Sequence, residues 1–533
     1  MKSFLNAFSK FVLGILNGFD RLVFRGHLRT LTYREGMESF LNANGVLRKD
    51  FKEHCLAQTE KVLQASFAEA KELKRPIEYL ASSQESKEER ARVLAAKHNI
   101  REGLICIFKC VEPCATFFPH YNRQTKKLEI QPKIGKCSFL YRYAFHPVFG
   151  FMHARVQTWY PFHVQICLNG REWLGRQLDQ LGMHYKRRDN KFLWVEDFAR
   201  AQQLLDQQLT VHWPELLKGI LKEVHPSHPE LLGRLPLDYY WSVHQSEWAT
   251  DIAFRSATDL RRLYSQWLRH AITNYSSADV FRFLGRKLTP DGKIWTRFQG
   301  EITSGMTRRA EGVRIKHWVD YNSIKMYDCI DDFIQDCEAV LRIETTVNNP
   351  DDFRVFRAKQ GGPEDDKAWR PLRKGVADLH RLAQVSQAAN ERYAAAAAAL
   401  KDTTPLSAWA EPLCRRAPAP GKNRQRKVRA LNPLASEDAA LLTAVLDPKF
   451  AVNGLRNRDL VAMLWTKPAT TDKERRRRSA RVTRQIRMLR GHGILNKVPK
   501  THRYVVSDTG RKAVTALLAA RNANAEFLNT NAA

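Results

Sequence analysis

The residues best suited to chemistry lie in two short apolar segments between positions 314 and 347. In SIKMYD, Lys325 and Tyr327 alternate with other residues, and in VLRIET, Arg342 and Glu344 do the same. Successive side chains of a strand point to opposite faces, so each pair shares one face. A hairpin of these strands would gather a tyrosine hydroxyl, two cations and a carboxylate. Such a group is suited to attack on a phosphodiester, because the cations neutralise the charge that develops at phosphorus.

The pattern of a (K/R)-x-Y-D strand followed by a strand with L-R-x-E is similar to the motif of replication initiation factors from rolling-circle plasmids and phages. The resemblance implies a nuclease domain that nicks one DNA strand and holds it covalently, with carboxylates binding a divalent metal. It makes Tyr327 the nucleophile and places Lys325, Arg342 and Glu344 beside it. This chain departs from the family at Cys329, where a lysine is typical. The alternative is a structural hairpin whose cations bind phosphate while Glu344 pairs with one of them.

A first group of candidate metal ligands lies in the segment Phe162-His163-Val164-Gln165. His163 and Gln165 would share one face of a strand, which resembles the metal-binding motif of some viral replication initiators. The alternative is a strand histidine that is structural or contacts nucleic acid. With such a site, other tyrosines become candidate nucleophiles, namely Tyr185, Tyr239 and Tyr240.

A second group of candidate ligands is acidic. Glu247 and Asp251 are spaced i and i+4 in SEWATD, so on a helix they would share a face. Together with Asp320 or Glu344 they could hold Mg²⁺ or Mn²⁺, as in carboxylate-cluster nucleases. The alternative is a solvated or helix-capping acidic turn.

The composition predicts an anionic partner. The chain has 87 Lys and Arg against 56 Asp and Glu, a net charge of +31. The cations are spread along the chain rather than gathered in one amphipathic helix, which favours nucleic acid over a membrane surface. DNA is the expected partner, structured RNA is the alternative, and a homodimer is left open. Without a Walker loop, dinucleotide fingerprint or G-x-S-x-G elbow, no nucleotide or organic cofactor is expected.

The clearest module lies near the C-terminus. Three helical segments are followed by a basic hairpin, and in the third Val482, Ile486 and Leu489 share an apolar face. Residues 436–522 resemble the winged-helix domains of bacterial transcription regulators and mobile-element proteins; the alternative is a winged helix that contacts only protein. Nucleic-acid contacts are expected from Arg475, Arg476, Arg477 and Arg478 at the entrance of the third helix, from Arg481, Arg484, Arg487 and Arg490 within it, and from Lys497, Lys500, His502 and Arg503 in the hairpin.

The elements that position these residues predict an α+β protein. We expect a helical N-terminal domain over residues 1–100, an antiparallel sheet with covering helices over 101–212, an α+β domain with a long helix over 213–410, a basic linker over 411–435, the winged helix over 436–522, and a tail over 523–533. The strands after residue 295 form either a second sheet or the completion of the first.

The N-terminus and the cysteines predict a cytoplasmic protein. The apolar start of the chain is interrupted by Lys10, Asn17 and Asp20, so a packed amphipathic helix is favoured over a signal peptide. The nine cysteines are scattered, several of them within apolar strands, which is typical of reduced thiols. A zinc site at Cys110, Cys114 and Cys137 is the alternative, although a matching second pair is lacking.

These observations predict a nucleic-acid-binding protein of a mobile element or replicon. It would recognise DNA with the winged helix and nick or transfer a strand with a metal-assisted central domain. Two alternatives are a non-catalytic RNA-binding component of a ribonucleoprotein and a transcription regulator whose large N-terminal region senses a ligand or partner.

Overall fold

The computed structural model describes the chain except for residues 81–84, 233–236, 274, 276, 287–299, 310–311, 331–338, 360–361, 364, 399–405, 421–425, 448–449, 451–453, 500 and 523–533. Two compact units are formed. One comprises Phe8–Ser265 and Thr303–Glu391, and the other comprises Met1–Ala7, Gln266–Ile302 and Arg392–Ala533. Among the described helices, none is long and apolar enough to cross a membrane. The predicted tail lies outside the described residues.

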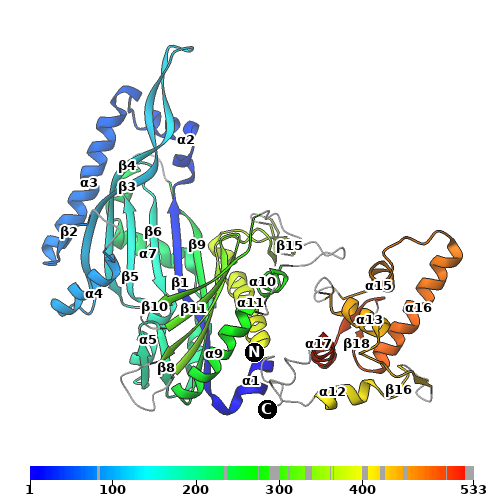
Figure 1. Cartoon of the computed structure of the whole chain (residues 1–533). Helices are drawn as coiled ribbons and strands as arrows, with labels where there is room; N and C mark the ends of the chain where they lie inside the picture. The colour runs from blue at the N-terminus through cyan, green and yellow to red at the C-terminus, as the bar shows by residue number, and fades with distance from the viewer. Residues whose placement is uncertain are drawn as a thin grey trace. The chain divides into compact units, whose positions relative to one another are not determined.

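The first unit is built on a large antiparallel sheet, so the chain is a mixed helix and sheet protein as predicted (Figure 1). Among the described residues the sheet has eleven strands in the order β10-β11-β12-β13-β9-β1-β6-β5-β4-β3-β2, and only the β2–β3 pair is parallel. The strands span Val12–His27 (β1), Ile77–Tyr79 (β2), Gly103–Asn122 (β3), Lys127–His146 (β4), Gly150–Gln157 (β5), Val164–Asn169 (β6), Tyr240–Phe254 (β9), Thr303–Arg309 (β10), Gly312–Val319 (β11), Asn322–Ile330 (β12) and Ala339–Val347 (β13).

The predicted separation of residues 101–212 from 213–410 is wrong. The later strands complete the first sheet, because β1 pairs with β6 on one side and with β9 on the other. The prediction of a helical domain over residues 1–100 is also wrong at its start, where Val12–His27 is this central strand. A strand that is buried on both faces lacks the alternation of apolar and polar residues that marks a half-buried strand. Its sequence pattern therefore cannot be told from that of a buried helix.

The sheet contains the same topology twice. In each half a first strand is followed by a four-stranded meander whose last strand returns to pair with the first: β1 with β3 to β6, and β9 with β10 to β13. The two first strands pair antiparallel with each other, with Phe19 opposite Trp248. The halves are therefore related by an approximate two-fold axis at the centre of the sheet.

Helices cover both faces of this sheet. They span Arg34–Ala43 (α2), Phe51–Glu72 (α3), Lys87–Lys97 (α4), Gly170–Gln180 (α5), Phe198–Gln207 (α6), Trp213–Val224 (α7), His228–Leu231 (α8), Ala257–Thr273 (α9) and Leu379–Ala398 (α11), the last being the predicted long helix. The hairpins β7–β8 (Tyr185–Arg188, Lys191–Val195) and β14–β15 (Arg354–Arg357, Ala368–Pro371) lie outside the main sheet.

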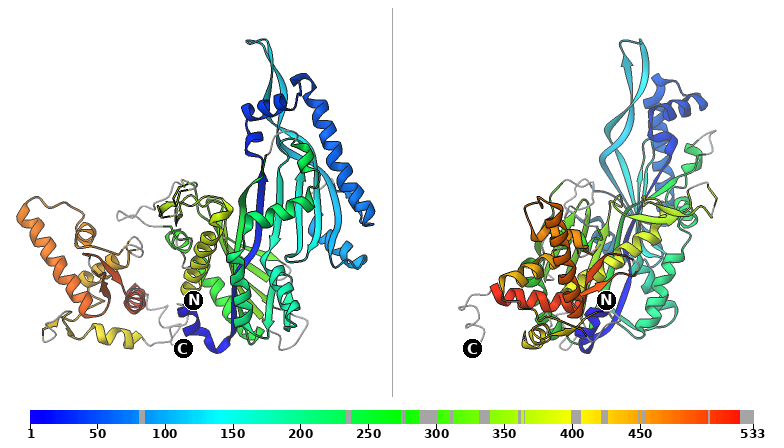
Figure 2. Two further views of the ribbon diagram at one scale, coloured as in Figure 1. Left: turned by 180° about the vertical axis from the view of Figure 1, so that it is seen from behind. Right: turned by 90° about the vertical axis from the view of Figure 1, so that its right-hand side faces the viewer.

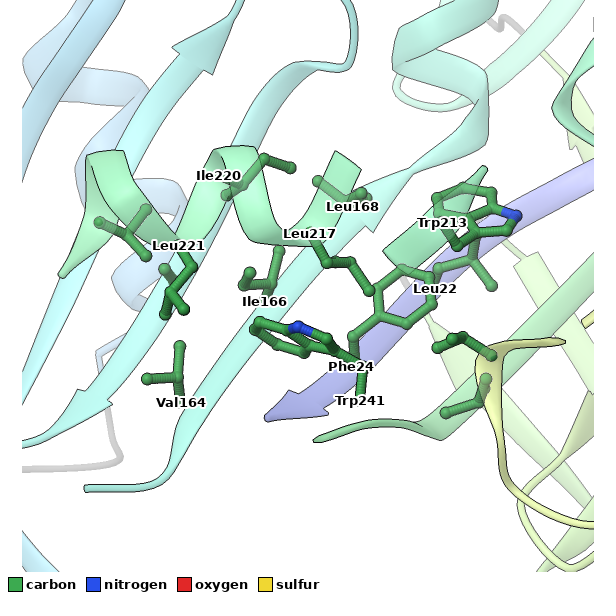
Figure 3. Close-up of a cluster of buried hydrophobic side chains, with 14 of the residues drawn as sticks. Leu22, Phe24, Val164, Ile166, Leu168, Trp213, Leu217, Ile220, Leu221 and Trp241 are labelled. Atoms are coloured by element: carbon green, nitrogen blue, oxygen red, sulfur yellow. The ribbon is translucent and has the colours of Figure 1, made fainter. Parts of the chain in front are cut away.

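The core of the first half lies between α7 and the strands β1 and β6 (Figure 3). On α7, Trp213, Leu217, Ile220 and Leu221 recur at helical spacing, so they form one apolar face. They pack with Leu22, Phe24, Val164, Ile166 and Leu168, all buried. Burying each large side chain contributes about 1.5–3 kcal/mol relative to its exposure.

Helix α6 lies unusually close to β1. A Cβ atom on Gly14 would lie 2.2 Å from the ring of Phe198, and one on Gly18 would lie 2.9 Å from Leu205. A side chain at Gly14 would therefore displace the Phe198 ring, whereas one at Gly18 would need only a shift of the Leu205 methyl group. On the opposite face of the sheet, Asn390 of α11 accepts a hydrogen bond from the Thr345 hydroxyl at 2.7 Å.

The second unit holds the C-terminal module. Its elements span Lys2–Phe8 (α1), Ser277–Phe283 (α10), Leu406–Leu413 (α12), Ala417–Pro418 (β16), Lys427–Val428 (β17), Ser436–Leu446 (α13), Asn457–Leu464 (α15), Asp472–Gly491 (α16), Leu495–Lys497 (β18), Tyr504–Val506 (β19) and Asp508–Asn522 (α17). Helix α16 is the long orange helix of Figure 2. Val482, Ile486 and Leu489 are buried, as predicted.

The predicted linker is not free chain where it is described. Leu413 and Leu431 belong to the same apolar cluster as α13 and α16. The Leu431 amide donates to the Leu413 carbonyl at 2.9 Å, and Arg429 forms an ion pair with Asp438. Apolar residues at both ends of a Pro-rich basic stretch dock it onto its neighbouring module.

Candidate active site

Three carboxylates from three adjacent strands meet at the centre of the sheet. Asp20 lies on β1, Glu247 on β9 and Glu344 on β13, and one oxygen of each lies within 4.8 Å of the others. Asp20 and Glu344 are buried, whereas Glu247 keeps 13% of its side chain exposed. The carboxylate triad of Asp20, Glu247 and Glu344 is thus set into the sheet but reachable from solvent.

The predicted tyrosine and lysine lie beside this triad. The β12–β13 hairpin has the predicted face, with Lys325 opposite Glu344 and Tyr327 opposite Arg342. The Tyr327 hydroxyl donates to Glu344 Oε2 at 3.1 Å, and Lys325 Nζ forms an ion pair with Glu344 Oε1. The hydroxyl, the ammonium group and a carboxylate are therefore in direct contact.

Arg342 lies among acidic partners. It is fully buried, donates from Nη2 to Asp251 Oδ2 at 2.7 Å, and donates from Nη1 to Asp20 Oδ2 at 3.1 Å. Arg171 of α5 lies 3.3 Å from the same Asp251 carboxylate. Because its donors are engaged, Arg342 fixes the position of Asp20 rather than meeting a phosphate, and Asp251 is held by two guanidinium groups.

The electrostatics of the triad show charge in excess. Burial and the nearby Glu344 carboxylate raise the pKa of Glu247 to about 7. Burial also raises the pKa of Asp20, against the opposing effect of Arg342. For Glu344 the charge and hydrogen bond of Lys325 outweigh burial, and its pKa is lowered. Carboxylates this close raise one another's pKa, and the Lys325 and Arg342 cations oppose that effect.

The donor set fits a divalent ion such as Mg²⁺ or Mn²⁺. These ions prefer oxygen ligands and are often bound by one to three carboxylates and water. The triad supplies three carboxylates whose oxygens lie within 4.8 Å of one another. Bound there, the ion would polarise a phosphate and stabilise the developing charge.

Two of the acidic ligands predicted from sequence, Asp251 and Asp320, do not join the triad. Glu247 and Asp251 lie on strand β9, not on a helix; they still share a face because four residues are also two strand periods. Asp320 lies in the turn after β11, where its carboxylate accepts from Asn349 Nδ2 at 2.9 Å. The helix prediction failed because β9, like β1, is a central strand buried along most of its length.

His163 and Gln165 are not near the carboxylates. Gln165 lies opposite Arg25, five residues along β1 from Asp20, or roughly 16 Å. His163 precedes β6, with its ring centroid 6.3 Å from that of His27. Burial, together with nearby cationic groups, lowers the pKa of His163 to about 4. The predicted histidine-glutamine metal site therefore does not combine with the triad.

The alternative tyrosines also have other partners. The Tyr185 hydroxyl donates to Asp179 at 2.9 Å, and the Tyr239 hydroxyl donates to the Phe162 carbonyl at 2.8 Å. Tyr240 lies beneath the Arg29 guanidinium, 3.5 Å from the ring centroid. Of the four candidate nucleophiles, Tyr327 alone contacts the triad.

The sequence did not identify Asp20 as a site residue, nor its neighbours Asn190 and Lys191. Asn190, in the turn of the β7–β8 hairpin, donates to Asp20, and Lys191 Nζ lies 5.8 Å from the Tyr327 ring centroid. A single carboxylate inside the apolar run GILNGFDRLVF was the available signal, because a buried acid is rare without a partner. Its partners come from distant parts of the chain.

The side chains predicted to contact nucleic acid from α16 differ in whether they already form ion pairs. The helix begins at Asp472, so Arg475, Arg476, Arg477 and Arg478 lie within it rather than at its entrance. Ion pairs hold Arg475 with Asp472, Arg478 with Glu474 and Arg481 with Glu437, and Arg490 lies over Tyr504. Exposed side chains belong to Arg475, Arg476, Arg477, Arg481, Arg484, Arg487, Lys497 and His502, and Arg503 is half-buried; Lys500 lies outside the described residues.

Comparison with protein-family models, curated proteins and solved structures finds no match for this chain.

Proposed function

We propose that this protein is a metal-dependent DNA-nicking and strand-transfer enzyme with Tyr327 as its nucleophile. One observation carries the proposal: the Tyr327 hydroxyl donates at 3.1 Å to a member of a three-carboxylate group able to hold Mg²⁺ or Mn²⁺. A hydroxyl, a base and a metal site in contact are the parts that phosphodiester transfer requires.

The proposed reaction conserves the phosphodiester. Tyr327 gives its phenolic proton to Glu344, and the phenolic oxygen bonds to phosphorus while one bond from phosphorus to a sugar oxygen breaks. The sugar oxygen takes a proton from solvent and leaves as a hydroxyl, and the phosphate stays on Tyr327. Burial and Glu344 raise the pKa of Tyr327 well above its usual value, so the hydroxyl is neutral at rest. A cation bound at the triad would lower the pKa of the Tyr327 hydroxyl and so ease the loss of its proton.

The C-terminal module supplies DNA recognition in this proposal. Three helices followed by a two-stranded hairpin are the elements of a winged helix, and Leu455 bridges to Tyr504 beside the hairpin. Arg484 and Arg487 lie exposed on the face of α16 opposite its buried residues. The net charge of +31 favours the same partner.

The test is a covalent adduct. Full-length protein is incubated with labelled single-stranded DNA and Mn²⁺ or Mg²⁺, and a denaturing gel is read for labelled protein. We expect an adduct that Tyr327→Phe abolishes and that Asp20→Asn reduces on the order of 10²-fold. Tyr185→Phe is the matched control, because Tyr185 also donates to a carboxylate but lies outside the triad.

Absence of an adduct in every DNA tested, or an adduct that survives in Tyr327→Phe, would overturn the proposal. Tightly bound RNA without cleavage would instead favour the RNA-binding alternative. DNA binding by the C-terminal module without cleavage would favour a transcription regulator.

A further inference from the structure

Strand β11 and the turn that joins it to β12 display two aromatic side chains and a lysine. Trp318 is 37% exposed and Tyr321 is 81% exposed. Lys316 Nζ lies 4.0 Å from the centroid of the Trp318 ring.

Lys316 and Trp318 belong to the face of the sheet that carries Tyr327. Lys316 is directly opposite Lys325, and Trp318 is directly opposite Ser323. Ser323, Lys325 and Tyr327 alternate along β12, so they share one face. Trp318 therefore lies about four residues, or roughly 13 Å, from the level of the nucleophile along the strand.

The backbone of the turn holds Tyr321 in a costly conformation. Asp320 and Tyr321 have φ values of 50° and 62°, the left-handed values of a two-residue hairpin turn that Asn and Gly usually occupy. Three asparagines fix the turn: Asn322 Oδ1 accepts from the amides of Asn348 and Asn349. A bulky residue kept in this conformation and pointed into solvent indicates a role outside folding.

We propose that Lys316, Trp318 and Tyr321 form a platform that binds single-stranded DNA beside Tyr327. This inference rests on the proposed function, which it deepens by assigning the form of the substrate. Aromatic rings stack on bases whose faces are free, as in a single strand, and a lysine next to them contacts the phosphates. In a duplex those faces are already stacked on each other.

The spacing suits this substrate. Stacked nucleotides advance about 3.4 Å along a strand, so roughly four would connect Trp318 with the level of Tyr327. The intervening Lys325 lies on the same face. The platform would then hold the bases next to the scissile phosphate while the triad holds the phosphate itself.

The test measures binding apart from cleavage, in full-length protein that carries Tyr327→Phe. Fluorescence anisotropy with a labelled single strand and with the same sequence as a duplex compares Trp318→Ala, Tyr321→Gly and Lys316→Gln. We expect Trp318→Ala and Tyr321→Gly to weaken single-strand binding about 5- to 100-fold, with duplex affinity unchanged. Trp369→Ala is the matched control, because Trp369 is 58% exposed on β15.

Tyr321→Gly gives a second readout that separates binding from folding. Glycine adopts the left-handed turn without strain, so this variant should unfold at a higher temperature while binding the single strand more weakly. Unchanged single-strand affinity in Trp318→Ala and Tyr321→Gly, or an equal loss for duplex, would overturn the platform. A missing adduct in the wild-type protein, with these losses intact, would overturn only the proposed nuclease.

Discussion

The two halves of the sheet share a topology and differ in what their strands carry. In the second half, β12 and β13 hold Lys325, Tyr327 and Glu344. Their topological counterparts in the first half, β5 and β6, contain no Asp, Glu or Tyr. The first half instead has long outer strands: β3 and β4 have 20 residues each, and beyond the part of β4 that pairs with β5 they continue as a ribbon (Figure 2).

The difference teaches that one half supplies most of the candidate site and the other half completes the site where the two halves pair. Asp20 comes from the first strand of the first half, and Glu247 comes from the first strand of the second half. The β1–β9 pairing that joins the halves is therefore what closes the triad. A buried charged cluster at this seam depends on complete pairing, since each unpaired buried charge is strongly destabilising.

The largest expected effect compares a buried arginine from each half. Arg342→Met should lower the free energy of unfolding by about 3–5 kcal/mol, because Asp251 and Asp20 are left buried without their partner. Arg142→Met should lower it less, because its partner Glu69 is a third exposed and can be hydrated. Urea unfolding followed by circular dichroism measures both. Equal losses would show that the seam is not the more strongly coupled region.

A smaller effect concerns the pH dependence of stability at the seam. The pKa of Glu247 is about 7 in the folded chain, above its ordinary value, so the folded state binds the extra proton. Stability should therefore fall as the pH rises from about 4.5 to 7, by on the order of 1–3 kcal/mol. Glu247→Gln should remove this fall, and Mg²⁺ should raise the melting temperature of the wild type more at pH 8 than at pH 5. A flat pH profile in the wild type would contradict the cause assigned to this shift.

The smallest expected effect concerns DNA binding by α16, which belongs to neither half of the sheet. Arg484→Ala with Arg487→Ala should weaken duplex binding and reduce the slope of log affinity against log salt by about 2, since each lost phosphate contact removes nearly one ion. Arg475→Ala with Arg481→Ala is the matched control, because both side chains are engaged in ion pairs. An unchanged slope in the first pair would remove α16 from the interface.

Part of the site was open to prediction because it is local. Lys325, Tyr327 and Glu344 lie on two strands close in sequence, and the period of two places them on one face. The buried face of α16 followed from helical spacing in the same way. The charge balance, the short strands and the basic hairpin likewise follow from composition and local pattern.

The rest depended on long-range pairing. Asp20 lies in a run with no alternation, and only the pairing of β1 with β6 and β9 makes that run a central strand. The pairing of β13 with β9 places Arg342 opposite Asp251, and the two side chains bind each other. Strand partners distant in sequence leave no local periodic signal, so the sequence determined which groups were available, and the tertiary structure decided which of them meet.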